Sequence, residues 1–357
     1  MTNKRKVAVL GSTGLVGQHF VRMLDGHPDF EIAVLAGSER SAGHVYAEVV
    51  DWAAGGEIPS RAGKTVVQPA SVESVVASGV EVVFSALPAS TAGPSEAALR
   101  NRGLFIFTNA SSHRADPDVP VVIPEINPDH LELAARQKRA HGGFIVADSN
   151  CSTAGLALLL APLRPLGLRS VVVTTFQAIS GAGRRGLAAM DITANCVPFI
   201  PNEEEKLGRE PGRILGTLDQ NGIKPWPVPV RANCCRVPVR DGHLLSISLE
   251  FDRAVEERAA AEALAAFRGL PQKWNLPSAP AQPVIVRTEE ARPQPVLDAW
   301  AGSPERARGM AVTAGRLRSR DRFLDLFGLV HNTVRGAAGT CLLTAELALK
   351  QGLLDTK

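Results

Sequence analysis

A cysteine in a run of small polar residues is the first candidate for chemistry in this 357-residue chain. Cys151 lies in the segment 149–155 (SNCSTAG), between a predicted strand and a predicted helix. The dipole of a helix stabilises a thiolate at its N-terminus, so Cys151 is a candidate nucleophile. The alternative interpretation is a buried structural thiol.

A cation and an imidazole follow Cys234 and Cys235. Residues 236–239 are predicted to be extended, so Arg236 and the turn-proximal His243 can face one cleft. A guanidinium suits a carboxylate, and an imidazole suits proton transfer. Ordinary surface positions are the alternative for both residues.

An acidic cluster begins a predicted helix after Pro201. Glu203 and its two following glutamates complement the dipole there, and a solvated first turn explains them by itself. One of these carboxylates also suits a substrate amino group, and Lys206 shares the helix face of Glu203.

A glycine turn, residues 11–17 (GSTGLVG), directly follows the first predicted strand and opens the first helix. Glycines permit close backbone approach, and a helix N-terminus attracts a pyrophosphate. The spacing differs from the G-x-G-x-x-G fingerprint, so a turn without a ligand is the alternative. The candidate cofactor-binding positions here are Gly11, Ser12, Thr13, Gly14, Leu15 and Val16.

The end of the second predicted strand indicates which nucleotide would bind. Ser38, Arg40 and Ser41 supply hydroxyls and a guanidinium suited to a 2′-phosphate, which favours NADP over NAD. Glu39 could instead bind a ribose hydroxyl or lie in solvent.

The elements that must position these groups divide the chain in two. The first part alternates short β-branched runs with helical spacing, which predicts a Rossmann-type parallel sheet. Its strands are expected at 6–10, 31–36, 80–85, 104–108 and 143–147, and its helices at 16–25, 93–102 and 128–140.

The second part favours an α+β domain with a mixed or antiparallel sheet. Strands are expected at 171–178, 244–251 and 284–288, helices at 153–163, 185–195 and 255–267, and a connecting loop at 271–295. The expected domains are residues 1–148 for the nucleotide, 149–336 for catalysis and dimerisation, and a C-terminal helix in 337–357 that returns to the first domain.

Composition excludes several classes of protein. Thirty-nine Lys and Arg against 36 Asp and Glu leave a net charge of only +3, which does not favour nucleic-acid binding. No apolar run approaches the length of about 20 residues that spans a bilayer, so no membrane partner is expected. The five cysteines show no C-x-x-C spacing, so neither a disulfide framework nor a metal site is indicated, and a reducing cytoplasm fits.

Taken in order, these motifs resemble aspartate-semialdehyde dehydrogenase, in the branch of that family common in archaea and fungi. The resemblance covers nearly the whole chain. Its motifs are residues 11–17, 38–43, 149–153, 177–183, 202–206, 236–243 and 331–339. It implies an NADP-dependent enzyme that forms a homodimer or homotetramer.

The resemblance also implies the roles of individual residues. Cys151 would form a thioester, and His243 would be the acid/base that takes and returns the proton. Gln177 would orient the substrate or the imidazole side of the site, Arg236 would clamp the α-carboxylate, and Glu203 would meet the amino group.

Further positions follow from the resemblance for phosphate and cofactor. Arg114, in the segment that starts at Asn109, matches the phosphate-binding arginine of the family, and Lys206 would assist it. The positions implied along the nicotinamide end of NADP are Ser85, Ser180, Gly181 and Asn332.

The implied reaction is reduction of L-aspartyl 4-phosphate to L-aspartate 4-semialdehyde, with release of inorganic phosphate. Cys235 stands where the family usually has asparagine, and Arg184 and Arg185 replace an expected aromatic residue and proline, which could favour another acidic acyl donor. The alternatives are therefore an acyl-CoA reductase resembling malonyl-CoA reductase, an N-acetyl-glutamyl-phosphate reductase relative, and a non-catalytic NADP-binding paralogue.

Overall fold

The computed structural model describes residues 4–355, which form two compact units. The first unit contains the chain up to Val122, then Pro128–Asp148, and then the segment from Ala337 onward. The second contains Ile123–Asn127 and Ser149–Gly336.

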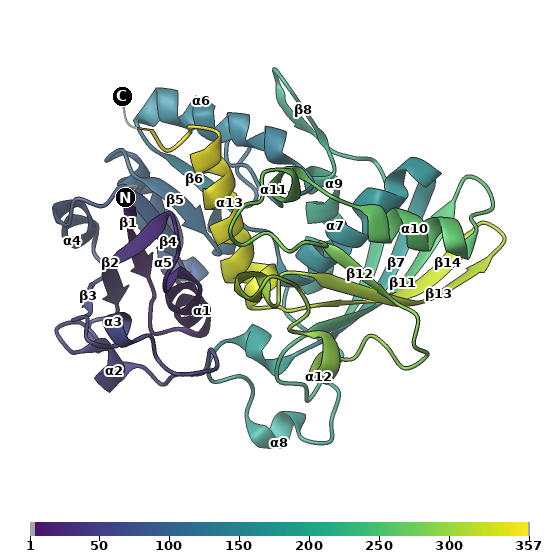
Figure 1. Cartoon of the computed structure of the whole chain (residues 1–357), viewed down its shortest axis with the longest axis horizontal. Helices are drawn as coiled ribbons and strands as arrows, with labels where there is room; N and C mark the ends of the chain where they lie inside the picture. The colour runs from purple at the N-terminus through teal and green to yellow at the C-terminus, as the bar shows by residue number, and fades with distance from the viewer. Residues whose placement is uncertain (1–3, 356–357) are drawn as a thin grey trace. The chain divides into compact units, whose positions relative to one another are not determined.

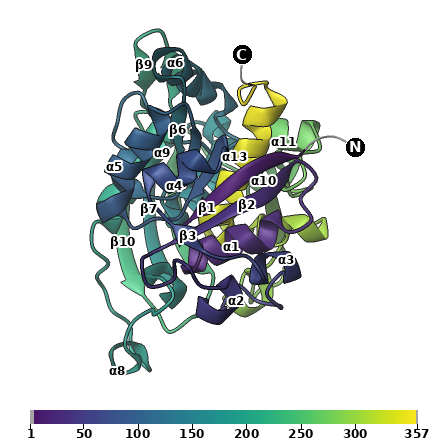
Figure 2. The same ribbon diagram turned by 90° about the vertical axis from the view of Figure 1, so that its left-hand side faces the viewer.

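The first unit is built on a six-stranded sheet in the order β3-β2-β1-β4-β5-β6, with every pair parallel (Figures 1 and 2). The strands are β1 Arg5–Leu10, β2 Phe30–Gly37, β3 Gln68–Pro69, β4 Val82–Ser85, β5 Phe105–Thr108 and β6 Phe144–Ala147. The strand order reverses between β1 and β4. Ligands of such sheets bind at the carboxyl ends of the strands beside this reversal.

Helices and short 3-10 turns surround this sheet. They are α1 Leu15–Leu24, α2 Tyr46–Val49, α3 Ser60–Gly63, α4 Val72–Ala77, α5 Ala89–Arg100, η1 Ser111–His113, η2 Pro128–His130, α6 Leu131–His141 and α13 Gly339–Lys350. The C-terminal helix α13 contacts β5 and α1 and is buried along most of its length. The central strands are buried as well, as expected for a parallel sheet that is covered on both faces.

The second unit is built on a mixed sheet in the order β10-β7-β11-β14-β13-β12. The strands are β7 Leu168–Gln177, β10 Val230–Arg236, β11 His243–Phe251, β12 Val284–Arg287, β13 Val312–Arg320 and β14 Phe323–Val330. β10 is parallel to β7 and β12 to β13, whereas β11 runs antiparallel to both β7 and β14. A separate hairpin joins β8 Thr217–Asp219 and β9 Gly222–Lys224.

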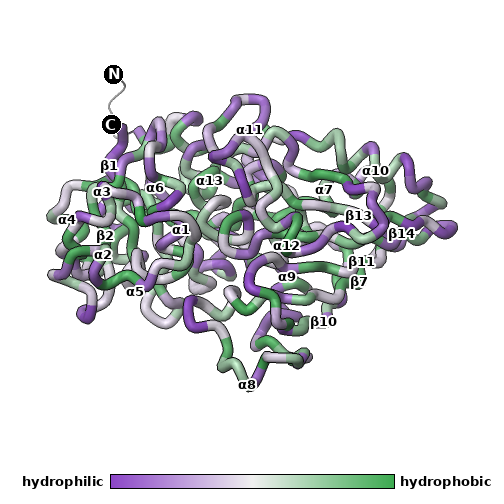
Figure 3. The backbone as a smooth tube through the Cα atoms, turned by 60° about the horizontal axis from the view of Figure 1, so that its bottom comes forward, coloured by the Kyte–Doolittle hydropathy of each residue, from purple (hydrophilic) through white to green (hydrophobic). Residues whose placement is uncertain are grey.

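The helices of the second unit are α7 Cys151–Leu163, η3 Arg164–Leu166, η4 Ile179–Ala182, α8 Ala189–Ile192, α9 Glu203–Ile214, α10 Glu257–Ala266, α11 Leu270–Lys273, α12 Pro295–Asp298, η5 Glu305–Ala307 and the π-helical turn η6 Val334–Ala338, which ends in the first unit. α7 and α10 lie against the mixed sheet (Figure 1). α7 is apolar around most of its circumference, and the tube is green along much of it (Figure 3). It is therefore the central core helix of this unit.

The fold confirms the predicted parallel sheet and the predicted mixed sheet. The helix expected at 185–195 was wrong, because only the single turn α8 forms there. Gly183 and Gly186 adopt positive φ before it, and the segment is largely exposed. The strand expected at 284–288 is confirmed as β12, whereas most of α11 lies in the expected loop 271–295 and was not predicted.

Three strands of the second sheet escaped the sequence analysis. β10 carries polar residues among its apolar ones, and the outer half of β13 carries Arg316, Arg318 and Arg320. β13 forms a hairpin with β14, which alternates buried and less buried residues. Their pairing in the sheet decides their structure more than their composition does.

A buried ion pair holds the segment Ile123–Asn127 in the second unit. Nη1 and Nη2 of Arg335 donate to Oε1 and Oε2 of Glu125 at 3.0 and 2.5 Å, and both side chains are 0% exposed. The backbone of Glu125 also lies so close to Gly269 that a Cβ there would be 2.4 Å from Cα of Glu125. The pair therefore ties two distant parts of the chain together.

Replacing Arg335 with leucine would leave the Glu125 carboxylate buried without its bidentate partner. We expect the Arg335→Leu variant to lose about 3–5 kcal/mol of unfolding free energy, measured by urea denaturation. The double variant Glu125→Leu/Arg335→Leu should recover part of this loss, because it removes both charges. The control Arg258→Leu breaks an exposed pair with Glu262 and should leave the midpoint unchanged. A wild-type midpoint for Arg335→Leu would contradict the assigned role of the buried pair.

Candidate active site

Cys151 is the first residue of α7, and Asn150 caps that helix. The Asn150 side-chain oxygen accepts hydrogen bonds from the backbone N–H groups of Ser152 at 3.0 Å and Thr153 at 3.2 Å. The partly exposed Cys151 thiol therefore lies at the positive end of a 13-residue helix. This position stabilises the thiolate form.

His243 contacts that thiol from the start of β11. Its Nε2 lies 3.2 Å from Sγ of Cys151, and its side chain is completely buried. On the other side of the ring, Nδ1 accepts a hydrogen bond of 3.0 Å from the backbone N–H of Ala178. Burial, together with the charge of Arg236, lowers the pKa of His243 to about 3, so the ring is neutral at neutral pH.

Arg236 ends β10 beside the same cluster. It is opposite Gln177 in the parallel ladder between β10 and β7, is only 6% exposed, and donates from Nη1 to the Ala178 carbonyl at 2.8 Å. Burial lowers the pKa of Arg236, while the charges of Cys151 and Glu203 oppose that change. A cation is thus held next to the Cys151 thiol.

Glu203 begins α9 and is the acceptor of a buried network. Asn150 Nδ2 donates to both of its oxygens at 3.0 and 2.9 Å, Gln177 Nε2 donates at 3.1 Å, and Lys206 Nζ donates at 2.9 Å. Burial alone would raise the pKa of Glu203, but the Lys206 charge and these hydrogen bonds lower it overall. The carboxylate is therefore ionised and supports Asn150 and Gln177 directly.

Ser180 and Asn332 are joined by a hydrogen bond of 2.8 Å from Asn332 Nδ2 to Ser180 Oγ. Asn332 also accepts from the backbone N–H of Gly242 at 2.9 Å, so it links η4 to the residue before His243. Gly181 lies against the cluster, because a Cβ there would be 2.8 Å from Nη1 of Arg236 and 3.2 Å from Cε1 of His243. These implied cofactor positions therefore lie in the same unit as the thiol.

Arg114 and Asn109 belong to the first unit. Arg114 donates from Nε to the Asp148 carbonyl at 2.8 Å and from Nη2 to the Asn109 carbonyl at 3.0 Å. The Asn109 amide lies 3.2 Å from Sγ of Cys341. Arg114 is therefore held by backbone groups at the carboxyl ends of β5 and β6, where parallel sheets bind ligands.

The glycine turn packs closely against backbone atoms, which only glycines permit at Gly11 and Gly17. Gly11 has a φ of +70°, and a Cβ on Gly17 would lie 2.2 Å from the Gly11 carbonyl oxygen. The turn therefore runs tightly from β1 into α1, whose first N–H groups have no acceptor within the helix. Thr13, Gly14 and Val16 remain accessible there, whereas Ser12 and Leu15 are buried. These features fit a pyrophosphate.

The residues expected at the 2′-phosphate lie after β2. Ser38 and Arg40 are exposed, and Ser41 is buried and donates from Oγ to the Ser38 carbonyl at 3.0 Å. Ser85 is buried at the end of β4 and donates to Glu96 at 2.6 Å. The hydroxyls of Ser41 and Ser85 therefore form hydrogen bonds within the protein, while the exposed Arg40 side chain is available to a ligand.

Two supporting residues were missed by the sequence analysis. Asn150 belongs to the quoted motif 149–153, but its capping and its bond to Glu203 were not predicted. The preference for asparagine before a helix was the available signal. Glu210 of α9 accepts from the backbone N–H of Asn150 at 2.6 Å, and only the packing of α9 against α7 could have indicated it.

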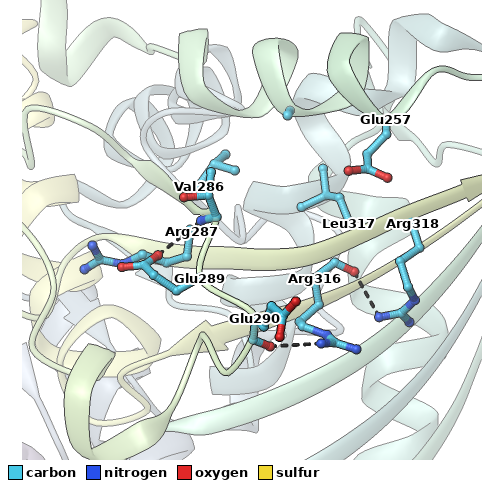
Figure 4. A pocket seen from close by; sticks show the side chains of 10 residues that line it. Glu257, Val286, Arg287, Glu289, Glu290, Arg316, Leu317 and Arg318 are labelled. Atoms are coloured by element: carbon cyan, nitrogen blue, oxygen red, sulfur yellow. Dashed lines mark hydrogen bonds between the residues drawn. The ribbon is translucent and has the colours of Figure 1, made fainter.

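A separate surface pocket in the second unit lies between α10, β12 and β13 (Figure 4). Its walls carry Glu257, Arg287, Glu289, Glu290, Arg316 and Arg318. Arg316 donates to the Glu290 carbonyl and Arg318 to the Arg316 carbonyl, as the dashed lines in Figure 4 show. The acidic and basic side chains of its walls are equal in number, and none of the predicted site residues lines the pocket. We therefore do not place the predicted catalytic chemistry in this pocket.

Comparison with known proteins identifies the family. Residues 6–134 match the semialdehyde dehydrogenase NAD-binding domain, and residues 160–335 match the semialdehyde dehydrogenase dimerisation domain. The chain belongs to the semialdehyde dehydrogenase family. This confirms the resemblance drawn from the motifs.

Relatives within the family are similar over their full lengths. The chain is 46% identical over 347 residues to aspartate-semialdehyde dehydrogenase of Methanothermobacter thermautotrophicus, across 96% of this chain and 98% of that protein. It is 40% identical over 363 residues to the Schizosaccharomyces pombe protein of the same name, with 98% and 99% covered. It is 38% identical over 363 residues to malonyl CoA reductase (NADP) of Metallosphaera sedula, with both chains fully covered.

Solved structures of the family share the fold. The crystal structure of aspartate semialdehyde dehydrogenase with NADP from Candida albicans matches with a TM-score of 0.88 and 36% identity, over 98% of this chain and 99% of that one.

Across residues 4–355, no helix combines the length and hydrophobicity that crossing a membrane requires. The same residues contain no group of three or more His, Cys, Asp or Glu side chains that could hold a metal ion.

The close approach at Gly181 gives a direct test of this candidate active site. A methyl group there would collide with Arg236 and crowd His243, so we expect Gly181→Ala to lower kcat/KM by about tenfold or more without unfolding the protein. Steady-state kinetics would measure kcat/KM, and circular dichroism would show whether the variant is folded. Gly208→Ala is the matched control, since a Cβ there meets its nearest atom at 3.7 Å. Wild-type kinetics for Gly181→Ala would contradict the assigned geometry.

Proposed function

We propose that this chain is an NADP-dependent aspartate-semialdehyde dehydrogenase. It would convert L-aspartyl 4-phosphate to L-aspartate 4-semialdehyde and inorganic phosphate through a thioester on Cys151, in the biosynthesis of lysine, threonine and methionine. The observation that supports this most is the contact of the Cys151 thiol with His243, beside Arg236 and Glu203. The names of the archaeal and fungal relatives point the same way.

The nucleophile begins the proposed reaction. The Cys151 thiolate attacks the acyl carbon, a C–S bond forms, and the bond from that carbon to the phosphate oxygen breaks. Arg114 and Lys206 would offset the charge of the departing phosphate. Arg236 would hold the α-carboxylate of the substrate, and the ionised Glu203 would meet its amino group.

The second half of the reaction reduces the thioester. When bound, NADPH supplies the hydride that this reduction needs. His243, whose Nε2 lies 3.2 Å from the sulfur, would be the acid/base that takes the proton of the Cys151 thiol and returns it as the C–S bond breaks and the aldehyde leaves. Gln177 would orient the substrate from its position between Glu203 and Thr175.

The first unit would bind NADP, with the glycine turn at the pyrophosphate and Ser38, Arg40 and Ser41 at the 2′-phosphate. Ser85, Ser180, Gly181 and Asn332 would lie along the nicotinamide end. Under this proposal residues 1–148 form the NADP-binding domain, 149–336 the catalytic and dimerisation domain, and 337–357 return to the first.

The match to a dimerisation domain supports a homodimer or homotetramer as the assembled form. Five free cysteines support a location in the cytoplasm.

The decisive assay follows NADP reduction with L-aspartate semialdehyde, with and without inorganic phosphate, and with CoA in a parallel reaction. We expect reduction that requires phosphate, because phosphate must release the acyl group from Cys151 in this direction. Cys151→Ala should abolish turnover and keep NADP binding, while Cys196→Ala, which removes an exposed thiol, should keep both. Activity that needs CoA instead would support the acyl-CoA reductase alternative, and appreciable activity of Cys151→Ala would exclude the thioester.

The cofactor assignment has its own test at the exposed Arg40. Because its guanidinium would pair with the 2′-phosphate, Arg40→Ala should raise KM for NADP by about tenfold and leave KM for NAD nearly unchanged. Steady-state kinetics with both nucleotides would measure this. An equal effect on the two nucleotides would contradict the assignment.

A further inference from the structure

A backbone bridge at the end of β10 brings two cysteines of the second unit together. Val197 and Arg236 form an antiparallel bridge, in which the N–H of each residue donates to the carbonyl of the other at 3.0 and 2.8 Å. Cys196 precedes Val197, and Cys235 precedes Arg236. Two backbone hydrogen bonds therefore fix the place at which these cysteines meet.

The two thiols lie on the same side of this bridge. Side chains alternate between the faces of extended chain, so Cys196 and Cys235 point to the face opposite that of Val197 and Arg236. Side chains offset in this way across an antiparallel pair remain within reach of each other. The thiols of Cys196 and Cys235 form a hydrogen bond. Only a small further approach of the two sulfur atoms is needed for a covalent bond.

The two thiols differ in their access to solvent. Cys196 is exposed, so a dissolved oxidant reaches its sulfur first, whereas Cys235 is half-buried. Burial raises the pKa of the Cys235 thiol, and the neighbouring Cys196 thiol and Glu204 carboxylate raise it further. Cys196 is therefore the thiol that starts an exchange reaction, and Cys235 is the one that completes it.

We propose that Cys196 and Cys235 are a site of reversible disulfide formation, with a small-molecule disulfide such as oxidised glutathione as the oxidant. The bond fastens the segment 183–202, which is largely exposed and connects η4 to α9, to the end of β10. The family resemblance implies asparagine at position 235, which cannot form this bond. The site uses no group of the proposed reaction, so it does not depend on that reaction.

The exchange takes place in two balanced steps. The Cys196 thiolate attacks one sulfur of oxidised glutathione, a mixed disulfide forms, and one glutathione thiolate leaves. The Cys235 thiolate then attacks Sγ of Cys196, which forms the protein disulfide, breaks the mixed disulfide and releases the second glutathione. The two cysteines lose two electrons and two protons, and one oxidised glutathione becomes two reduced molecules. An excess of a reduced dithiol reverses both steps.

The disulfide leaves the neighbouring guanidinium in place. Arg236 points to the other face of the bridge and keeps its backbone hydrogen bonds to Val197. The loop that the disulfide closes contains α9 and the β8–β9 hairpin, so the bond restricts the unfolded chain over a long segment. We therefore expect a more stable protein whose catalytic rate is retained.

Peptide mapping identifies the bond. The wild-type protein is incubated with oxidised glutathione, its remaining thiols are alkylated, and it is cleaved with trypsin. Peptide 186–206 contains Cys196, and peptide 232–236 contains both Cys234 and Cys235. We expect mass spectrometry to find these two peptides joined, and to find them separate after treatment with dithiothreitol. Cys235→Asn should abolish the joined pair, whereas the matched control Cys234→Ala, which removes a buried thiol, should keep it.

Three results of this mapping would overturn the proposal. The first is a bond between Cys234 and Cys235 inside peptide 232–236. The second is a joined pair that survives Cys235→Asn. The third is a Cys196 that carries glutathione in the wild-type protein as fully as it does in Cys235→Asn, because a resolving thiol would have displaced it.

Thermal unfolding and kinetics test what the bond does. Oxidation should raise the Tm of the wild-type protein by about 3 °C or more and leave that of Cys235→Asn unchanged. Glutathione bound to Cys151 lowers activity equally in both proteins, so the wild-type rate relative to Cys235→Asn measures the effect of the disulfide alone. We expect this ratio to stay within about twofold of its value in the reduced proteins. An unchanged wild-type Tm, or a larger loss of wild-type activity, would contradict the fastening described above. If Cys235→Asn does not fold, Cys196→Ser replaces it in both experiments.

Discussion

The pairing of β7 with its two neighbouring strands places the side chains that surround the Cys151 thiol. Arg236 of β10 is opposite Gln177 at the end of β7, and His243 begins β11 one residue before the pair of Leu244 with Phe176. Because side chains alternate between the faces of a strand, a slip of one residue would turn these groups away from Cys151. The rest of the site depends on this register, and α7 then brings the thiol to it.

The same arrangement holds two buried ionisable groups in opposite charge states. Glu203 is ionised, because Lys206 and two side-chain amides compensate its burial. His243 is neutral, because burial and the charge of Arg236 act against the cation. Groups whose environments drive their charge states apart are typical of catalytic sites. Here the difference provides an anion that holds neighbouring amides and a neutral ring in contact with the sulfur.

The segment at which the chain leaves the second unit also contacts the candidate active site. Asn332 bonds Ser180 and Gly242, and Arg335 forms the buried pair with Glu125. Gly336 has no room for a side chain, since a Cβ there would lie 2.6 Å from Cβ of Cys151. The segment 331–339 therefore combines buried polar contacts with a close approach to Cys151, immediately before the chain continues into the first unit.

The sequence alone determined the parallel sheet with its glycine turn and the position of Cys151 at a helix start, because these depend on local periodicity and on neighbouring residues. Motif order also indicated the family. Only the tertiary structure decided how β10, β13 and β14 pair in the second sheet. It also decided the hydrogen bonds of Asn150 with Glu203 and Glu210, and the hydrogen bond from the backbone N–H of Ala178 to His243. Asn150 and Glu210 are 60 residues apart, and Ala178 and His243 are 65 apart. Local spacing carries no information about such contacts, because strand register and helix packing create them.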